Sequence, residues 1–189
     1  MKTETLAGTS RPPAVLDLYP LDELYSLRGQ ALPAIEPVQA AEMPEPSRSL
    51  LAHESDMTST LESFYGEKLR LAVFGRRMAG NEYLREVVLR LGPHGRSVEY
   101  GAIRIILDIL PEGVRREILR EQQPLGRILA QWGMAFSSQP RAYLRIASDD
   151  FLNRTLDLGG RRWLYGRRNA LMDGWERPLA EIVEILPPS

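Results

Sequence analysis

The segments EYLREVVLRL (82–91), GPHGR (92–96) and SVEYGAIRIILDIL (97–110) decide the predicted fold. The two long segments are rich in β-branched and aromatic residues and alternate with a period of two, which is typical of strands. The Gly- and Pro-rich segment between them has the length of a hairpin turn. We therefore predict an antiparallel hairpin, and we expect a break or bulge in its second strand at Gly101.

Further strands are expected on both sides of this hairpin. They are LRLAVFGRR (69–77), RAYLRIAS (141–148), RRWLYGRRNALMDG (161–174) and ERPLAEIVEIL (176–186), the last two forming a hairpin that turns at Asp173-Gly174. Helical spacing and capping residues predict short helices at 57–65, 111–123, 124–133 and 149–160. The order of elements predicts an α+β fold with a single antiparallel sheet of about six strands and short helices beside it.

Composition excludes several kinds of function. The 189 residues have a formal net charge of −1, which argues against a protein built to hold nucleic acid. The absence of Cys excludes thiol nucleophiles, disulfides and Cys-based metal sites, and we expect His53 and His94 to be surface residues rather than metal ligands. The glycines form no phosphate-binding loop, so we expect no nucleotide cofactor.

The beginning of the chain also carries information about its surroundings. MKTETLAGTS (1–10) has no apolar core of a signal peptide, and no window of the chain approaches 18 consecutive apolar residues. We therefore expect a cytoplasmic protein with neither a secretory signal nor a membrane span.

Residues 1–48 differ from the rest of the chain. They hold seven of the fourteen prolines, which break any long helix. We predict a Pro-rich, partly extended N-terminal arm with one helical turn at Leu21–Leu27, followed by a domain at 49–189. The leucines at positions 16, 18, 24 and 27 are candidates to dock on the domain or on a partner; a loosely ordered tail is the alternative.

An arginine stands in an apolar row of the first hairpin strand. Strand parity places Arg85 on the same face as Tyr83, Val87 and Leu89. Because arginine is almost never buried without a partner, this row indicates either an internal salt bridge or an anionic ligand.

The closing strand shows a similar pattern with glutamates. Glu184 shares a face with Ile182 and Leu186, whereas Glu181 lies on the other face, so parity leaves both open as the interior carboxyl. A carboxyl in an apolar row is either paired with arginine or has a raised pKa. Together with Arg85, these glutamates suggest a pocket for an organic acid.

The predicted strand at 161–174, which precedes the closing strand, is rich in arginine. We expect its arginines to line a solvated face; they are Arg161, Arg162, Arg167 and Arg168.

From about Leu50 to Pro188 the chain resembles the chorismate pyruvate-lyase family, whose members make 4-hydroxybenzoate. Five matching pieces occur in family order: LLAHESDMTSTLE (50–62), EYLREVVL (82–89), QQPLGRIL (122–129), LYGRRNAL (164–171) and RPLAEIVEILPP (177–188). The resemblance implies a chorismate lyase-like fold, with short helices that cover a buried pocket. Residues 1–48 lie outside it.

The resemblance also implies roles for particular residues. The substrate-gripping arginine of the family falls on Arg85, and the backbone N–H groups that bind substrate fall on Met57 and Leu125. The glutamate that faces the ring hydroxyl falls on Glu184 after a one-residue gap, which keeps Glu181 as a rival. The helix at Met57 and the segment around Pro124 would then act as lids.

One position departs from the family pattern. Family members have Gly-Arg where this chain has Gly101-Ala102. The nearest substitute is Arg104, a candidate for substrate binding.

The activity implied is a cofactor-free elimination that converts chorismate to pyruvate and 4-hydroxybenzoate, without metal and with a small molecule as the partner. Arg85 and Glu184 would be the catalytic residues. A non-catalytic domain that binds a small aromatic carboxylic acid is the alternative, since the family fold is similar to the effector domain of some bacterial transcription regulators. Those carry an N-terminal winged helix, for which residues 1–48 are too short. A structural protein with an internal Arg–Glu pair is a third possibility.

Overall fold

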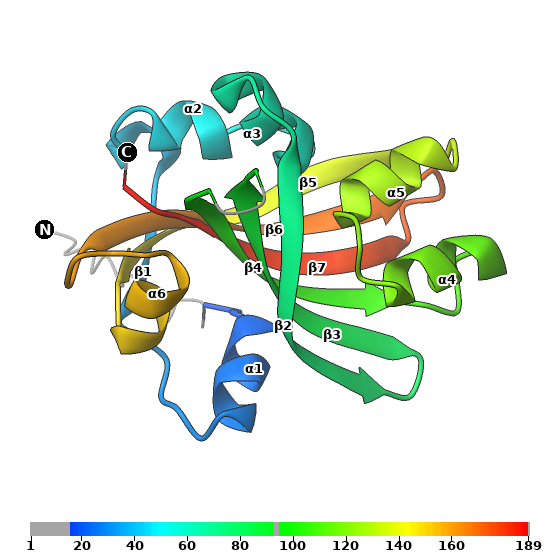
Figure 1. Ribbon diagram of the computed structural model, residues 1–189, viewed down its shortest axis with the longest axis horizontal. Coiled ribbons are helices and arrows are strands. Elements are labelled where there is room, and N and C mark those ends of the chain that lie inside the picture. The colour runs from blue at the N-terminus through cyan, green and yellow to red at the C-terminus, as the bar shows by residue number, and fades with distance from the viewer. Residues whose placement is uncertain (1–15, 93–94, 189) are drawn as a thin grey trace, which may run out of the picture.

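The computed structural model describes residues 16–92 and 95–188 (Figure 1). The first fifteen residues of the arm and His94 therefore lie outside the described residues. The helices are α1 (Leu21–Leu27), α2 (Ser47–Leu51), α3 (Met57–Tyr65), α4 (Glu112–Leu119), α5 (Leu125–Gln131) and α6 (Asp150–Thr155), with a 3₁₀ turn at Ala40–Glu42. The strands are β1 (Ile35–Val38), β2 (Leu69–Ala79), β3 (Glu82–Leu91), β4 (Ser97–Ile106), β5 (Phe136–Ala147), β6 (Trp163–Asp173) and β7 (Pro178–Leu186). No helix in the described part is long and apolar enough to cross a membrane.

In the described residues the strands form one antiparallel sheet in the order β1-β5-β6-β7-β4-β3-β2. The predicted α+β class with a single antiparallel sheet is confirmed. The sheet has seven strands rather than about six because Ile35–Val38, from the predicted arm, pairs with β5. Consecutive strands pair as hairpins within β2-β3-β4 and within β5-β6-β7, and β4 joins the two halves through β7.

The expected bulge at Gly101 is absent from β4. The register of the β3–β4 pair shifts between Leu89 and Arg90 instead, close to the turn. Gly101 lies opposite Val87 on one side and Glu184 on the other. A Cβ at this position would lie 3.0 Å from a methyl carbon of Val87, so the glycine serves close packing on the sheet face rather than a bend.

One face of the sheet is covered by α3, α4 and α5. Residues directly opposite in adjacent strands point to the same side, so Arg85, Ile103 and Ile182 form one row on this face. The row continues into an apolar core that includes Ile118 of α4 and Leu129 of α5, neither of which is exposed. Figure 1 shows α4 and α5 side by side near one end of the curved sheet.

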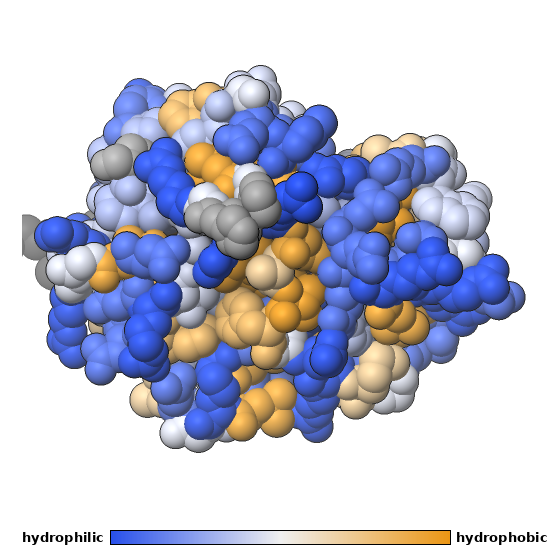
Figure 2. All heavy atoms as spheres, viewed as in Figure 1, coloured by the Kyte–Doolittle hydropathy of each residue, from blue (hydrophilic) through white to orange (hydrophobic). Residues whose placement is uncertain are grey.

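The opposite face carries a second core under α1 and α6. Leu21 and Tyr25 of α1 pack there with Leu152 of α6 against the sheet. Figure 2 shows apolar side chains gathered in the middle of one face of the molecule, between more hydrophilic rims. Both faces of the central strands are thus covered, which explains why these strands read as near-continuous apolar runs.

Apolar residues of the arm from Leu16 to Ile35 belong to this second core, whereas Met43 packs in a separate cluster with α3. The predicted helical turn is present as α1, where Leu24 is buried, and Leu16 and Leu18 pack against the same cluster. Leu27 is half exposed and does not dock. Burial of these leucines supports docking on the domain over a loose tail, and the division at residue 48 stays a prediction about the whole chain.

Candidate functional site

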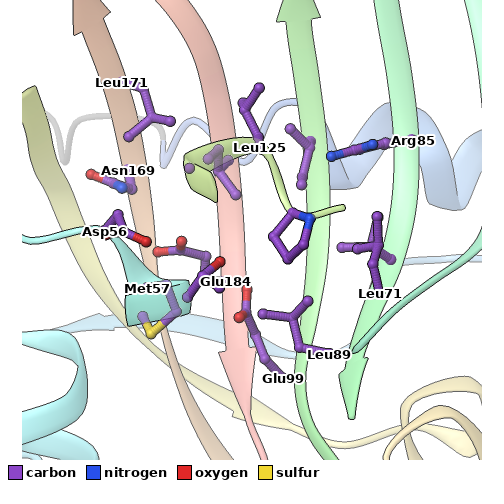
Figure 3. A pocket seen from close by; sticks show the side chains of 16 residues that line it. Asp56, Met57, Leu71, Arg85, Leu89, Glu99, Leu125, Asn169, Leu171 and Glu184 are labelled. Atoms are coloured by element: carbon purple, nitrogen blue, oxygen red, sulfur yellow. The ribbon is translucent and has the colours of Figure 1, made fainter. Parts of the chain in front are cut away.

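A pocket lies between the sheet and the beginnings of α3 and α5 (Figure 3). It encloses about 470 Å³, its mouth included. The strands β2, β3, β4, β6 and β7 supply its floor, and the segments at 56–58 and 124–126 supply its roof. The pocket therefore lies where the resemblance places lids, over the apolar row that contains Arg85.

The walls of the pocket are mainly aliphatic with a few polar groups. The apolar side chains of its floor are Leu71, Val87, Leu89, Ile103, Leu171 and Ile182. The polar residues are Asp56, Thr58, Arg85, Glu99, Asn169 and Glu184. Small-molecule sites typically combine an apolar wall with a few convergent polar groups in this way.

Arg85 is the cationic group of the pocket. Its side chain is fully buried, and its three guanidinium nitrogens have no hydrogen-bond partner among the described residues. Burial lowers the pKa of Arg85 to about 10, partly offset by the nearby Tyr83 and Glu121. A buried guanidinium with all of its N–H groups unsatisfied is costly, which makes an anion the fitting occupant.

Glu184 lies in the pocket but is not a lone carboxyl in an apolar row. It accepts a hydrogen bond from Nε of Arg167, and both side chains are almost completely buried. The expectation that Arg167 lines a solvated face is therefore wrong, because the segment before α3 covers it. Arg161 and Arg162 are exposed as expected, whereas Arg168 is only partly exposed and pairs with Glu181.

Arg167 also holds the segment that leads into α3. Its Nη1 donates to the carbonyl oxygens of His53 at 2.9 Å and Leu51 at 3.2 Å, and its Nη2 donates to that of Ser55 at 3.4 Å. Burial, followed by the charge of Arg167, lowers the pKa of His53. Glu184 and the roof of the pocket are thus connected through one side chain.

Glu99 on β4 is a pocket residue that the sequence analysis missed. It is 4% exposed, and its Oε2 has no partner within the described residues. Burial, and then the charge of Glu184, raises the pKa of Glu99 well above its usual range. The parity argument used for Arg85 could have found it, because Glu99 shares a face with Gly101 and Ile103.

The roof forms where two helices begin close together. Asp56 caps α3 by accepting a hydrogen bond from the backbone N–H of Ser59 at 3.0 Å, and Gly66 ends the helix with a φ of +67°. At Gly126, the second residue of α5, an added Cβ would lie 2.9 Å from Oδ1 of Asp56. This contact shows how tightly α5 approaches α3 over the pocket.

The structure places some predicted site residues together and others elsewhere. Met57, Arg85, Leu125 and Glu184 all line the pocket. Arg104 does not, because its parity puts it on the opposite face, where it pairs with Glu82 and Glu181. The same pairing makes Glu181 part of that ionic cluster and leaves Glu184 as the closing-strand carboxyl in the pocket.

Ala102 is buried on the same opposite face as Arg104, opposite Glu86 and Val183. The departure from the family pattern at this position therefore lies outside the pocket. Across the described ranges, His, Asp and Glu side chains do not come together in threes that could hold a metal ion.

Chemically, the pocket has a cationic end and an acidic end. Figure 3 shows Arg85 on one side of the pocket, with Glu99, Glu184 and Asp56 on the other. Aliphatic side chains lie between the two ends. This arrangement fits a flat apolar ring with an anionic group at one end and a polar group at the other.

The single antiparallel sheet with short helices on its faces is a fold that solved structures share. No protein-family model matches the chain, and no curated protein sequence matches it.

Among solved structures, PhnF from Mycobacterium smegmatis is similar with a TM-score of 0.56 and 13% identity, over 88% of this chain and 92% of that chain. The effector domain of PhnF gives a TM-score of 0.53 and 12% identity, over 69% and 87% of the two chains. A transcriptional regulator of the GntR family from Bacillus cereus gives a TM-score of 0.47 and 14% identity, over 64% and 92%. At these identities the likeness to PhnF and to its effector domain shows a shared fold.

Proposed function

We propose that the chain is a ligand-binding domain whose pocket binds a small aromatic carboxylic acid. 4-Hydroxybenzoate is a representative of this class of ligand. The observation that carries the proposal is the unpartnered guanidinium of Arg85 in the pocket. The solved effector domain of PhnF, which has the same fold, supports a binding role over a catalytic one.

The carboxylate of the ligand would lie on Arg85, in a bidentate pair that satisfies the buried N–H groups. The ring would lie among the aliphatic side chains of the floor. The backbone N–H groups of Met57 and Leu125, the first residues of α3 and α5, are further donors beside the pocket, since the first N–H groups of a helix have no partner within it. These assignments are part of the proposal.

The experiment is a thermal-shift and calorimetric titration of the purified protein with benzoate, 4-hydroxybenzoate and 3-hydroxybenzoate. Ligand at a hundred times its Kd should stabilise the folded protein by about 2.7 kcal/mol. The variant Arg85→Met should lose this stabilisation. Arg104→Met, which changes an arginine on the opposite face, is the matched control and should keep it. Equal stabilisation of the wild type and Arg85→Met would contradict the proposal.

A second candidate function is chorismate pyruvate-lyase activity. Its specific support is that Arg85, Glu184, Met57 and Leu125, the four positions carried over from the family, line one pocket. In that reaction the ether bond of chorismate breaks, the ring loses a proton and becomes aromatic 4-hydroxybenzoate, and the departing enolpyruvyl group gains a proton to give pyruvate. The protein would orient the dianion and stabilise the charge that develops on the departing enolpyruvyl group.

Incubation of the protein with chorismate, without cofactor, separates the two candidates. A coupled assay for pyruvate and chromatography for 4-hydroxybenzoate follow the products. Turnover that Arg85→Met abolishes would establish the lyase. Stabilisation by 4-hydroxybenzoate without release of pyruvate would establish the binding domain.

A further inference from the structure

Glu99 carries an unsatisfied polar atom into the pocket at the end away from Arg85. Strand register explains its position: Glu99 lies opposite Leu89 on β3, and the next residue on its face, Gly101, lies opposite Glu184 on β7. Gly101 contributes no side chain between the two glutamates on this face, and Glu184 is close enough for its charge to raise the pKa of Glu99. Figure 3 shows the two carboxyls on the same side of the pocket.

The surroundings of Glu99 favour its protonated form. The charges of Glu184 from β7 and of Asp56 from the start of α3 raise its pKa, whereas the charge of Arg167 from β6 lowers it. The neighbouring strand β3 presents the apolar Leu89. Burial, the largest cause, raises the pKa of Glu99 well above its usual range and so favours the protonated carboxyl, which can donate a hydrogen bond.

A buried glutamate of the same sheet shows what a structural role looks like. Glu86 on β3 is 3% exposed, as buried as Glu99, but it faces the opposite core. One of its oxygens accepts from the Tyr100 hydroxyl at 2.6 Å, and the other accepts from Arg28. Buried polar atoms are normally satisfied in this way. The free oxygen of Glu99 instead belongs to a side chain that lines the pocket.

We propose that Glu99 is a specificity-determining residue: together with Glu184 it binds an uncharged hydroxyl group of the ligand at the end away from Arg85. The proposal rests on the proposed function, because it assumes that the carboxylate of the ligand lies on Arg85. The O–H of Glu99 donates to the hydroxyl oxygen of the ligand, whose own hydrogen is donated to Glu184. A carboxylate at this end would meet the charge of Glu184, so dicarboxylates are rejected.

The test measures the Kd values of benzoate, 4-hydroxybenzoate and benzene-1,4-dicarboxylate by calorimetry at neutral pH. The wild type should bind 4-hydroxybenzoate roughly tenfold more tightly than benzoate, as expected for buried hydrogen bonds gained, and should bind the dicarboxylate more weakly than benzoate. Glu99→Leu should bring the ratio of the first two affinities close to one and keep benzoate binding. Glu181→Gln, a carboxyl-to-amide change on the opposite face, is the control and should leave the ratio unchanged.

The pH dependence gives a second readout through Glu99→Gln, whose amide donates but does not ionise. In the wild type the preference for 4-hydroxybenzoate over benzoate should be present below the pKa of Glu99 and decline as pH rises through it. In Glu99→Gln the preference should stay constant over that range. If Glu99→Leu does not fold, the pH profile of Glu99→Gln still tests whether Glu99 binds the hydroxyl group of the ligand.

The outcomes separate this proposal from the proposed function. If wild-type protein binds benzoate and 4-hydroxybenzoate equally, or if Glu99→Leu keeps the tenfold preference, the role of Glu99 is refuted and the binding function stands. Parallel pH profiles of the wild type and Glu99→Gln would refute it as well. If the wild type binds neither acid, both proposals fall.

Discussion

Replacing Arg85 by methionine is expected to make the ligand-free protein more stable. In the wild type the guanidinium is fully buried, and the described residues offer its nitrogens no acceptor. Folding therefore removes this charge from water with only partial compensation from the nearby Tyr83 and Glu121. Methionine also has an unbranched aliphatic side chain but carries no charge. The free-energy cost of burying the guanidinium charge is therefore absent in the variant.

The pKa of Arg85 gives the size of the effect. Burial lowers it from the ordinary value of arginine to about 10, and each tenfold change in the acid constant corresponds to about 1.4 kcal/mol. The folded state is therefore penalised by about 3 kcal/mol. Because the folded pKa lies below the unfolded one, the penalty is complete below about pH 10 and fades as the pH rises from there toward the ordinary pKa of arginine.

The shorter methionine leaves a small void that costs about 1 kcal/mol. A net gain of about 2 kcal/mol remains at neutral pH. For a chain of this size that gain raises the melting temperature by about 4–8 °C.

The assay is thermal and urea unfolding of both proteins at pH 7, with and without 4-hydroxybenzoate. The variant should melt higher without ligand and show no further shift with it. Arg104→Met is the control: it leaves Glu82 without its cation and Glu181 with Arg168 alone, and should melt lower than the wild type. A loss of stability in Arg85→Met would refute the reasoning, since it would mean that the guanidinium has a partner in the folded protein.

Three further substitutions have defined outcomes. Arg167→Met leaves Glu184 buried without its cation, so urea unfolding should show a loss of roughly 3–5 kcal/mol; a change below 1 kcal/mol would contradict the role of the pair. Gly126→Ala places a Cβ against Asp56 and should loosen the roof, with about 1 kcal/mol less stability and weaker binding of 4-hydroxybenzoate in calorimetry; unaltered affinity would speak against a close-fitting roof. Arg28→Ala removes the cation from the buried carboxylate of Glu86 on the opposite face. Urea unfolding should show a loss of about 3 kcal/mol, while the affinity for 4-hydroxybenzoate stays the same. Weakened binding would show that the two faces of the sheet are coupled.

The strands and the Arg85 row were predictable because a strand has a period of two. Once 82–91 is identified as a strand, parity alone assigns Arg85 to the face of Val87 and Leu89, and the structure places these residues around the pocket. The pairing of strands, in contrast, depends on residues that lie far apart in the sequence. The choice between Glu181 and Glu184 depended on which face of β7 looks into the pocket, and that follows from the register with β4 and β6.

The failures of the sequence analysis have physical reasons. β1 was missed because Pro37 interrupts a four-residue strand in a Pro-rich segment, but at the edge of a sheet proline is tolerated. Arg167 was assigned to solvent because its partners are carbonyl oxygens at 51–55, which no pattern within β6 reveals. Glu99 was missed although parity would have located it beside Gly101.

Arg85 and Arg104 show why parity finds a candidate site but cannot assign its role. Both stand in apolar strands of one hairpin, and both are largely buried. Arg104 meets two carboxylates on its face, so its charge is satisfied by the protein itself. Arg85 meets aliphatic side chains and a pocket, so its charge can be satisfied by an occupant. The penalty of about 3 kcal/mol on the buried guanidinium would be returned when an anion binds it, which corresponds to more than a hundredfold in affinity. The same side chain that lowers the stability of the free protein therefore supplies much of the free energy with which the pocket would hold a carboxylate.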